Sequence, residues 1–260
     1  MSVSAMANQP IAFAADPKIY RAIRWLLTLI MRVLYKYRVT GQEHVPATGR
    51  LIVAVNHLHL FDPFATAPAV PRQITTLAAE KWQKPGIAGW FLRCAGVIFV
   101  RRGEVDRQAL RACLAVLEED KALAIAPEGT RSKTHKMQRA KPGIAYLATR
   151  SDAPILPVTV WGVERLGDWK RLRRPTCHVA IGRPFRLPIA NDKASTDELQ
   201  HYADLVMLRL GQALPEEYRG VYTERIAAIE AGRSDELAVL RQPAAQAPQE
   251  AHALRHRPTD

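Results

Sequence analysis

The stretch VAVNHLHLFDPF, residues 53–64, places two histidines and an aspartate directly after an apolar run. Its residue types fit three kinds of chemistry or structure. His57 and His59 could share a metal ion, since paired imidazoles are common zinc ligands. His57 could be a general base whose tautomer is held by the carboxylate of Asp62. Alternatively, Asp62 and Pro63 could simply begin a helix, with Asp62 as N-cap and Pro63 at the first helical position.

The metal interpretation has the least support along the rest of the chain. A binuclear metallohydrolase would continue with Asp and His after the second histidine spacer, where Phe61 and Asp62 stand here. The other histidines form no pair with the spacing of metal ligands. We therefore predict no metal, while the general base and the helix start both remain open, because His-x4-Asp often occurs by chance.

Two further groups of polar residues follow apolar runs. One run ends on Arg101 and Arg102, and another ends on the turn Glu128, Gly129, Thr130 and Arg131. In an open α/β sheet, ligands bind beyond the carboxyl ends of the strands. Arginine is suited to bidentate binding of phosphate, and glycine lets the backbone approach an anion closely. We expect these groups and His57 to lie along one edge of a sheet.

The elements that would position these residues alternate between short strands and helices. Near-continuous apolar strands between helices predict an α/β fold with a mostly buried sheet. The expected strands lie in seven runs: YRVTG, LIVAV, ITTLAA, GVIFVRR, ALAIAPEG, ILPVTVWG and CHVAIGRPF. The expected helices span residues 63–69, 85–94, 106–120, 141–150 and 196–214.

The N-terminal region contains a helix of a different kind, predicted over residues 18–37. Its polar positions recur along one stripe, and the rest of its surface is apolar. This pattern is typical of a helix in a membrane interface, but a helix that covers a sheet would look similar. At the other end, residues 241–260 are rich in Pro, Ala, Gln and His, which predicts a disordered tail.

Charge and cysteine content narrow the classes of function. The chain has 260 residues and a net charge of +12, so its surface attracts polyanions. No nucleic-acid-binding motif accompanies this charge, and we expect no nucleic acid partner. The three cysteines form no metal-binding or disulfide pattern, and none adjoins a histidine of the motifs above, so no acyl-cysteine step is expected.

Taken together, these motifs resemble the 1-acylglycerol-3-phosphate acyltransferases, the lysophosphatidic acid acyltransferase family. The resemblance extends from about residue 39 to residue 185. The family's Asn-His-x4-Asp block matches Asn56, His57 and Asp62, and its Glu-Gly-Thr-Arg-Ser block matches residues 128–132 in full. Its Gly-x-x-Phe-(Ile/Val)-x-Arg block matches residues 96–102 with one residue of slack, and an apolar strand with a central Pro matches residues 155–160.

The resemblance implies a role for each candidate residue. His57 would deprotonate the acceptor hydroxyl, and Asp62 would orient and charge-pair with that histidine. The acceptor phosphate would be held by the turn after the third block, with help from the second block: Gly129, Thr130, Arg131 and Arg101. Glu128 would order that turn or contact the glycerol, and His59 would be a spectator.

The resemblance also implies the setting of the reaction. A single acyltransferase domain with a mixed sheet would span residues 38–240, after a membrane-interface segment at residues 1–37. The donor would be acyl-CoA or acyl-carrier protein, with no further cofactor, and the acceptor a lysophospholipid at the anionic, cytoplasmic face of the cell membrane. The basic segment KRLRR, residues 170–174, is a candidate docking patch. Two alternatives remain: another lyso-lipid acceptor, such as lyso-ornithine lipid, or an inactive protein that binds membrane surfaces.

Overall fold

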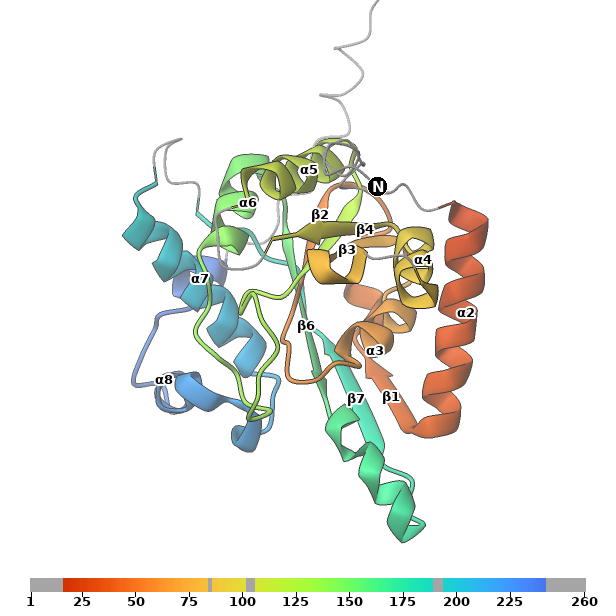
Figure 1. Ribbon diagram of the computed structural model, residues 1–260. Helices are drawn as coiled ribbons and strands as arrows, with labels where there is room; N and C mark the ends of the chain where they lie inside the picture. Colours follow the sequence, from red (N-terminus) through yellow and green to blue (C-terminus); the bar gives the residue numbers. More distant parts are fainter. Residues whose placement is uncertain (1–15, 84–85, 102–105, 189–193, 242–260) are drawn as a thin grey trace, which may run out of the picture.

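The computed structural model describes residues 16–83, 86–101, 106–188 and 194–241. Within this part, one sheet of seven strands has the order β1-β7-β6-β2-β5-β3-β4 (Figure 1). Each of the seven predicted β-rich runs contains one strand, which confirms the α/β fold with a mixed sheet. The strands are β1 (Lys36–Thr40), β2 (Leu51–Val55), β3 (Ile74–Ala79), β4 (Val97–Val100), β5 (Ala122–Ile125), β6 (Ile155–Trp161) and β7 (Thr176–Ile181).

The strand directions bring several chain segments to one edge of the sheet. Strands β2 to β6 run parallel to one another, whereas β7 is antiparallel to β6, and β1 is parallel to β7. The carboxyl ends of β2 to β6 and the amino ends of β1 and β7 therefore lie at the same edge. This is the edge at which ligands bind in open α/β sheets.

Helices cover both faces of the sheet, and the strands β2, β5 and β6 are apolar along almost their whole length, whereas the edge strand β1 is partly exposed. All five residues of β2 are buried: Leu51, Val53 and Val55 pack on one side, and Ile52 and Ala54 on the other. The first side carries α2 (Pro17–Leu34) and α3 (Asp62–Ala69). The second side carries α5 (Arg107–Glu118), α6 (Gly143–Ser151), α7 (Thr196–Gly211) and α8 (Thr223–Glu230) (Figure 1).

Shorter elements complete the described chain. Helix α4 (Ile87–Cys94) precedes β4, and the 3-10 helix η3 (Val163–Arg171) forms the projecting connection between β6 and β7 (Figure 1). The remaining 3-10 helices are η1 (Gln42–His44), η2 (Glu80–Gln83), η4 (Glu216–Tyr218), η5 (Gly220–Tyr222) and η6 (Ala238–Arg241). Residues 242–260, where the disordered tail is predicted, lie outside the described residues.

The N-terminal helix α2 ends earlier than the apolar pattern predicts. It stops at Leu34 instead of residue 37, because Tyr35 is extended and Lys36 N–H donates to the carbonyl of Pro175 (2.8 Å), which starts β1. Residue 37, the expected end of the N-terminal segment, therefore lies inside β1. The helix buries Tyr20, Leu27 and Met31 and exposes large apolar side chains on its other side. Within the described residues, no helix has the length and apolar character needed to cross a bilayer.

Candidate active site

Asn56 lies at the point where the backbone pairing of β2 with β6 ends and the site begins. The backbone register of β2 with β6 stops at Val55, which is opposite Val158. Beyond it, the Asn56 side chain replaces a peptide group: its Nδ2 donates to the Val160 carbonyl and its Oδ1 accepts the Val160 N–H, both at 2.8 Å. Asn56 is fully buried, so both bonds are shielded from water. The backbone leaves the sheet at this point, and His57 is the next residue.

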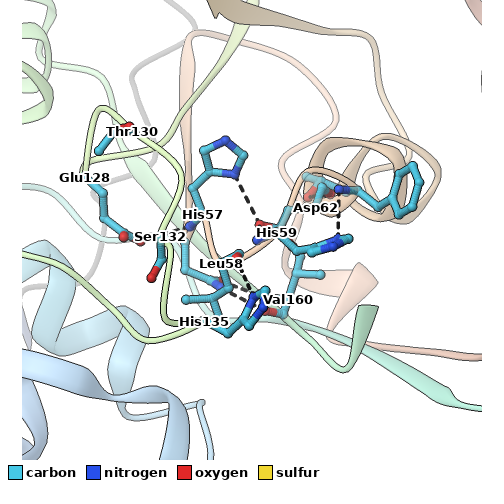
Figure 2. A network of polar contacts seen from close by, with 12 residues as sticks. His57, Leu58, His59, Asp62, Glu128, Thr130, Ser132, His135 and Val160 are labelled. Carbon is cyan, nitrogen blue, oxygen red and sulfur yellow. Dashed lines mark hydrogen bonds and ion pairs between the residues drawn. The ribbon is translucent and has the colours of Figure 1, made fainter. Parts of the chain in front are cut away.

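His57 and Asp62 form the central pair of the site (Figure 2). The Nδ1 atom of His57 lies 3.2 Å from Oδ2 of Asp62, which also accepts the backbone N–H of His59 at 2.7 Å. A carboxylate can only accept, so Nδ1 carries the proton and Nε2 is left with its lone pair. This is the tautomer that a general base requires.

Asp62 is the first residue of α3, whereas the sequence predicts it as the N-cap. The helix begins at Asp62, its N-cap is Phe61, and no side chain caps it. The Asp62 carboxylate makes no cap bond because it is turned back toward His57 and the His59 N–H. The helix start therefore orients the carboxylate toward His57, so a helix that begins at Asp62 and a His57–Asp62 pair exist in the same loop.

The Asp62 carboxylate is held in an unusual environment. It is only 1% exposed, and its Oδ1 has no hydrogen-bond partner among the described residues. Burial raises the pKa of this carboxyl above its ordinary value, although the hydrogen bonds from His57 and His59 act in the opposite direction. A buried, incompletely paired negative charge is costly, and protonation of the adjacent imidazole reduces that cost. The pair therefore favours the imidazolium that forms when His57 takes a proton.

His59 contributes to the site mainly through its backbone. Its ring Nδ1 accepts the N–H of Phe61 at 3.3 Å, and its ring lies against those of Phe61 and His135, with centroids 5.4 and 5.7 Å away. Burial lowers the pKa of His59, which favours its neutral form. Among the described residues, no group of three or more His, Cys, Asp or Glu side chains is placed to hold a metal ion.

The turn after β5 holds the His57 backbone from both sides. Glu128 Oε1 accepts the His57 N–H at 2.9 Å, and the Ser132 N–H donates to the His57 carbonyl at 2.8 Å (Figure 2). Glu128 Oε2 accepts the Gln138 N–H at 3.2 Å. Glu128 is 1% exposed, and burial raises the pKa of its carboxyl. Its side chain is thus directed into the protein, where it joins two loops.

The next residues of this turn point the other way. Gly129 has a φ of +67°, a conformation that glycine adopts without steric cost. A Cβ at Gly129 would lie 2.9 Å from Cδ of Lys141, so that lysine side chain runs alongside the turn. Thr130, Arg131 and Lys141 are exposed. The turn and Lys141 therefore present two exposed cations, Arg131 and Lys141, on the side of the turn away from Glu128.

Arg101 lies apart from these groups. It follows β4 at the end of the sheet, and strands β5 and β3 separate β4 from β2. At about 4.8 Å per strand, this places Arg101 about 14 Å along the edge from the His57 strand. The Nε of Arg101 lies 3.7 Å from Glu80 Oε2, and its backbone N–H donates to the carboxylate of Asp106. Arg102 lies outside the described residues.

An apolar cavity lies along this edge between the end of β2 and the end of β4. It has a volume of about 180 Å³ and is bordered by His57, Asp62 and Gly129 at one end and by Val100 of β4 at the other. Between them it is lined mainly by apolar and small side chains of β3 and β5 and their ends, namely Ile74, Thr76, Leu77, Ala78, Ala79, Ala124, Ile125 and Ala126. A flexible hydrocarbon chain fits such a lining better than a polar ligand does.

Three residues of the site had no role assigned from the sequence. Asn56 appears in the first motif, but only the structure shows that its side chain extends the β2–β6 pairing. Gln138 anchors Glu128, and Lys141 accompanies Gly129. An Asn placed directly after an apolar run was the sequence signal for Asn56. Gln138 and Lys141 have no local signal. The thiols of Cys113 and Cys177 are buried, which raises the pKa of each to about 12 and keeps both protonated.

Comparison with known protein families agrees with the chemistry that this edge can perform. Residues 36–161 match the model of the Acyltransferase family. This range runs from the first residue of β1 to the last residue of β6 and includes the His57–Asp62 pair and the turn after β5. Residues 36–161 are thus similar to the Acyltransferase family, and the resemblance inferred from the motifs is confirmed.

Individual relatives indicate which kind of acyltransferase the chain resembles. The chain is 26% identical over 189 residues to the 1-acyl-sn-glycerol-3-phosphate acyltransferase alpha of Mus musculus, covering 70% of this chain and 65% of that protein. It is 30% identical over 128 residues to the 1-acyl-sn-glycerol-3-phosphate acyltransferase of Borreliella burgdorferi, covering 48% and 51%. The chain thus spans less than two thirds of the length of either relative.

A solved structure shares the fold. The crystal structure of the 1-acyl-sn-glycerophosphate (LPA) acyltransferase PlsC from Thermotoga maritima superimposes with a TM-score of 0.57 and 22% sequence identity. The match covers 82% of this chain and 80% of that chain. The fold described above is therefore the fold of that acyltransferase.

Proposed function

We propose that this protein transfers an acyl group from a thioester donor to the free hydroxyl of lysophosphatidic acid, giving phosphatidic acid. The observation that carries the proposal is the His57–Asp62 pair, 3.2 Å apart, at the mouth of an apolar cavity. The named relatives, which are 1-acyl-sn-glycerol-3-phosphate acyltransferases, support the choice of acceptor.

The reaction follows from the tautomer of His57. Its Nε2 takes the proton of the acceptor hydroxyl as the oxygen attacks the thioester carbonyl. The negative charge of Asp62 stabilises the imidazolium that forms. When the tetrahedral intermediate collapses, the C–S bond breaks and the imidazolium returns the proton to the leaving thiolate. The reaction requires no acyl-enzyme. The buried thiols of Cys113 and Cys177 are protonated and therefore poor nucleophiles.

Each end of the substrates has a matching surface. The acyl chain of the donor would occupy the 180 Å³ cavity that starts at His57. The acceptor phosphate would bind the exposed turn of Gly129 and Thr130, with Arg131 and Lys141 as its cationic partners. Glu128, which joins the His57 backbone to Gln138, would position the base and leave substrate binding to its neighbours.

The direct test is acyl transfer by the purified protein from labelled acyl-CoA or acyl-carrier protein to lysophosphatidic acid. We expect product from the wild type and a loss of about 10²- to 10⁴-fold in His57→Ala. His59→Ala is the matched control, because it keeps the backbone N–H that Asp62 accepts, and it should stay within about threefold of the wild type. Equal losses in both variants would exclude His57 as the base.

We also propose that the protein binds the anionic, cytoplasmic face of the membrane through α2. The side of α2 turned away from the core exposes a group of large apolar side chains, namely Ile19, Trp25, Leu26, Leu29, Ile30 and Val33. Arg21 and Arg32 are exposed on the same helix. An amphipathic helix with basic residues binds an interface by apolar burial and by attraction to anionic lipids.

Vesicle binding tests this second proposal. The double variant Trp25→Glu/Leu29→Glu should lose most of its binding to phosphatidylglycerol vesicles in a sedimentation assay, because two charges replace apolar side chains at the interface. Val221→Glu is the control, since Val221 is also exposed but lies in η5, on the opposite side of the sheet. Unchanged sedimentation of the α2 variant would refute the role of α2.

A further inference from the structure

A second cavity lies at the same edge of the sheet as His57. It is a cleft of about 770 Å³ between the β6–β7 connection and η4, with Trp161 and Gly162 on one side and Glu217 and Tyr218 on the other. Its volume is within the range of sites that bind small molecules, which is about 300–1,000 Å³. The acyl-transfer roles of His57, Asp62 and the turn after β5 do not use this cleft, although three of its lining residues, Leu172, Arg173 and Arg174, belong to the basic segment 170–174.

The strand order places His57 between the two cavities. The apolar cavity extends from His57, after β2, across the ends of β5 and β3 to β4. The cleft lies in the other direction, where it is lined by the end of β6 and the starts of β7 and β1. The Asn56 side chain binds Val160, so His57 and Trp161 are each one residue beyond a directly bonded pair. The cleft is therefore adjacent to the catalytic loop.

The cleft is lined by cations and by an aromatic platform. Trp161 and His178 are opposite each other in the β6–β7 register, and their rings stack at 4.8 Å with an angle of 5°. Such planar rings are surfaces on which a nucleobase stacks. The cationic lining residues are Lys36, Arg165, Arg173 and Arg174, against the carboxylates of Asp168 and Glu217.

The cations differ in how firmly they are held. The guanidinium of Arg174 donates to the backbone carbonyls of Tyr35 (2.7 Å) and Arg32, which orients it without neutralising its charge. Arg165 is 3.6 Å from Glu164, whereas neither Lys36 nor Arg173 has an ion-pair partner within the described residues. The cleft therefore has positive charge available for phosphate groups.

We propose that this cleft binds the nucleotide end of acyl-coenzyme A. The inference rests on the proposed acyl transfer and names its donor. Acyl-CoA carries its reactive thioester between an apolar chain and a phosphorylated adenosine. The sheet edge has the same order: an apolar cavity, then His57, then a cationic cleft with a stacking platform. The adenine lies against Trp161 and His178, and the phosphates face Arg165 and Arg173.

The cleft is bordered by elements from both sides of the sheet. Trp161 and Tyr218 belong to the side that carries α7 and α8. Lys36 follows the C-cap of α2, and Arg174 donates to the carbonyls of Arg32 and Tyr35 at the end of that helix. A carrier protein would contact a broader surface and would have no adenine for the platform, so a concave cleft favours the smaller donor.

Binding of CoA and of adenosine 3′,5′-bisphosphate to the purified full-length protein tests the proposal, by calorimetry without acceptor. The double variant R165Q/R173Q should bind both at least about tenfold more weakly, since charge-assisted contacts to phosphate are lost. R171Q is the matched control, because Arg171 is on the same connection but does not line the cleft. The KM for acyl-CoA should rise in R165Q/R173Q with kcat unchanged, while turnover of acyl-pantetheine, which lacks the nucleotide, should not change.

Several results would overturn this assignment. Equal CoA affinity in the wild type and R165Q/R173Q would exclude the cleft, as would a wild type that binds no CoA and uses only acyl-carrier protein; the second result would leave acyl transfer itself intact. If R165Q/R173Q lost binding to phosphatidylglycerol vesicles but kept the CoA affinity of the wild type, the cleft would be a membrane contact instead. Conversely, CoA binding that R165Q/R173Q abolishes, in a protein that acylates no lysophospholipid, would support the cleft and refute the proposed acceptor.

Discussion

Replacement of Asp62 by Asn separates the charge of this residue from its shape. Asn has nearly the same size and can still accept the His59 N–H, but it cannot stabilise an imidazolium by charge. The His57 and Asp62 side chains are in contact at 3.2 Å, so their charge centres lie about 4 Å apart when His57 is protonated. At an effective dielectric constant of about 20, this attraction is worth about 4 kcal/mol. The transition state should lose about that much, which is about 10³-fold in kcat.

Stability should change in the opposite direction. Because burial raises the pKa of Asp62 in the folded protein, folding favours its protonated form. The stabilisation that comes from this preference is present below the ordinary pKa of an aspartate and is lost as the pH rises through the folded-state value. At neutral pH the ionised carboxylate therefore lowers stability, and Asp62→Asn should unfold at the same temperature as the wild type or at a higher one.

The assay combines kcat with lysophosphatidic acid and thermal unfolding at pH 7, and repeats the unfolding at lower pH. The difference in Tm between Asp62→Asn and the wild type should shrink as the pH falls, because the wild-type carboxyl becomes protonated. A loss of activity below about tenfold would refute the charge argument. A large drop in Tm together with the loss of activity would mean that Asp62 is needed for folding instead of catalysis.

Two further predictions concern the turn after β5. Gly129→Ala should lower the free energy of unfolding by about 1–3 kcal/mol in denaturant titration, since Gly129 has a positive φ and a Cβ there would crowd Lys141. Gly167→Ala, which has open space and no positive φ, should change little, and equal losses would contradict the strain argument. Arg131→Ala should raise the KM for lysophosphatidic acid about tenfold or more, since it removes a charge-assisted contact to phosphate. Arg101→Ala should raise this KM less, because three strand spacings separate Arg101 from the His57 strand. A larger KM increase in Arg101→Ala than in Arg131→Ala would place the acceptor phosphate near β4.

Local sequence patterns were sufficient for most of the secondary structure and for the central pair. The strands β2, β4, β5 and β6 are almost entirely buried, so each is a nearly unbroken apolar run that stands out from its neighbours. His57 and Asp62 are five residues apart in one loop, and a helix start at Asp62 is enough to bring the carboxylate back to the imidazole. The match to the family motifs added the roles, which composition and spacing alone left open.

The end of α2 and the cap of α3 show where local patterns were insufficient. The apolar periodicity of α2 continues to residue 37, but the backbone N–H of Lys36 pairs with Pro175, which is 139 residues away. Likewise, Asp62 has the residue type of an N-cap, but its carboxylate is occupied by His57 and His59. At the end of α2, a tertiary hydrogen bond ended the helix. At Asp62, contacts within the same loop took the place of an N-cap bond, a preference worth about 1 kcal/mol.

The amino-acid sequence by itself determined the strands, most of the helix bounds, the His57–Asp62 pair and the basic character of the surface, because each depends on residues close together in the chain. The tertiary structure alone decided that Glu128 holds the His57 N–H, that Asn56 binds Val160, and that Arg101 lies apart from the turn after β5. It also placed an apolar cavity and a cationic cleft on either side of His57. These features depend on the order β1-β7-β6-β2-β5-β3-β4, in which four of the six neighbouring strand pairs are not consecutive in the sequence, so no local pattern encodes them.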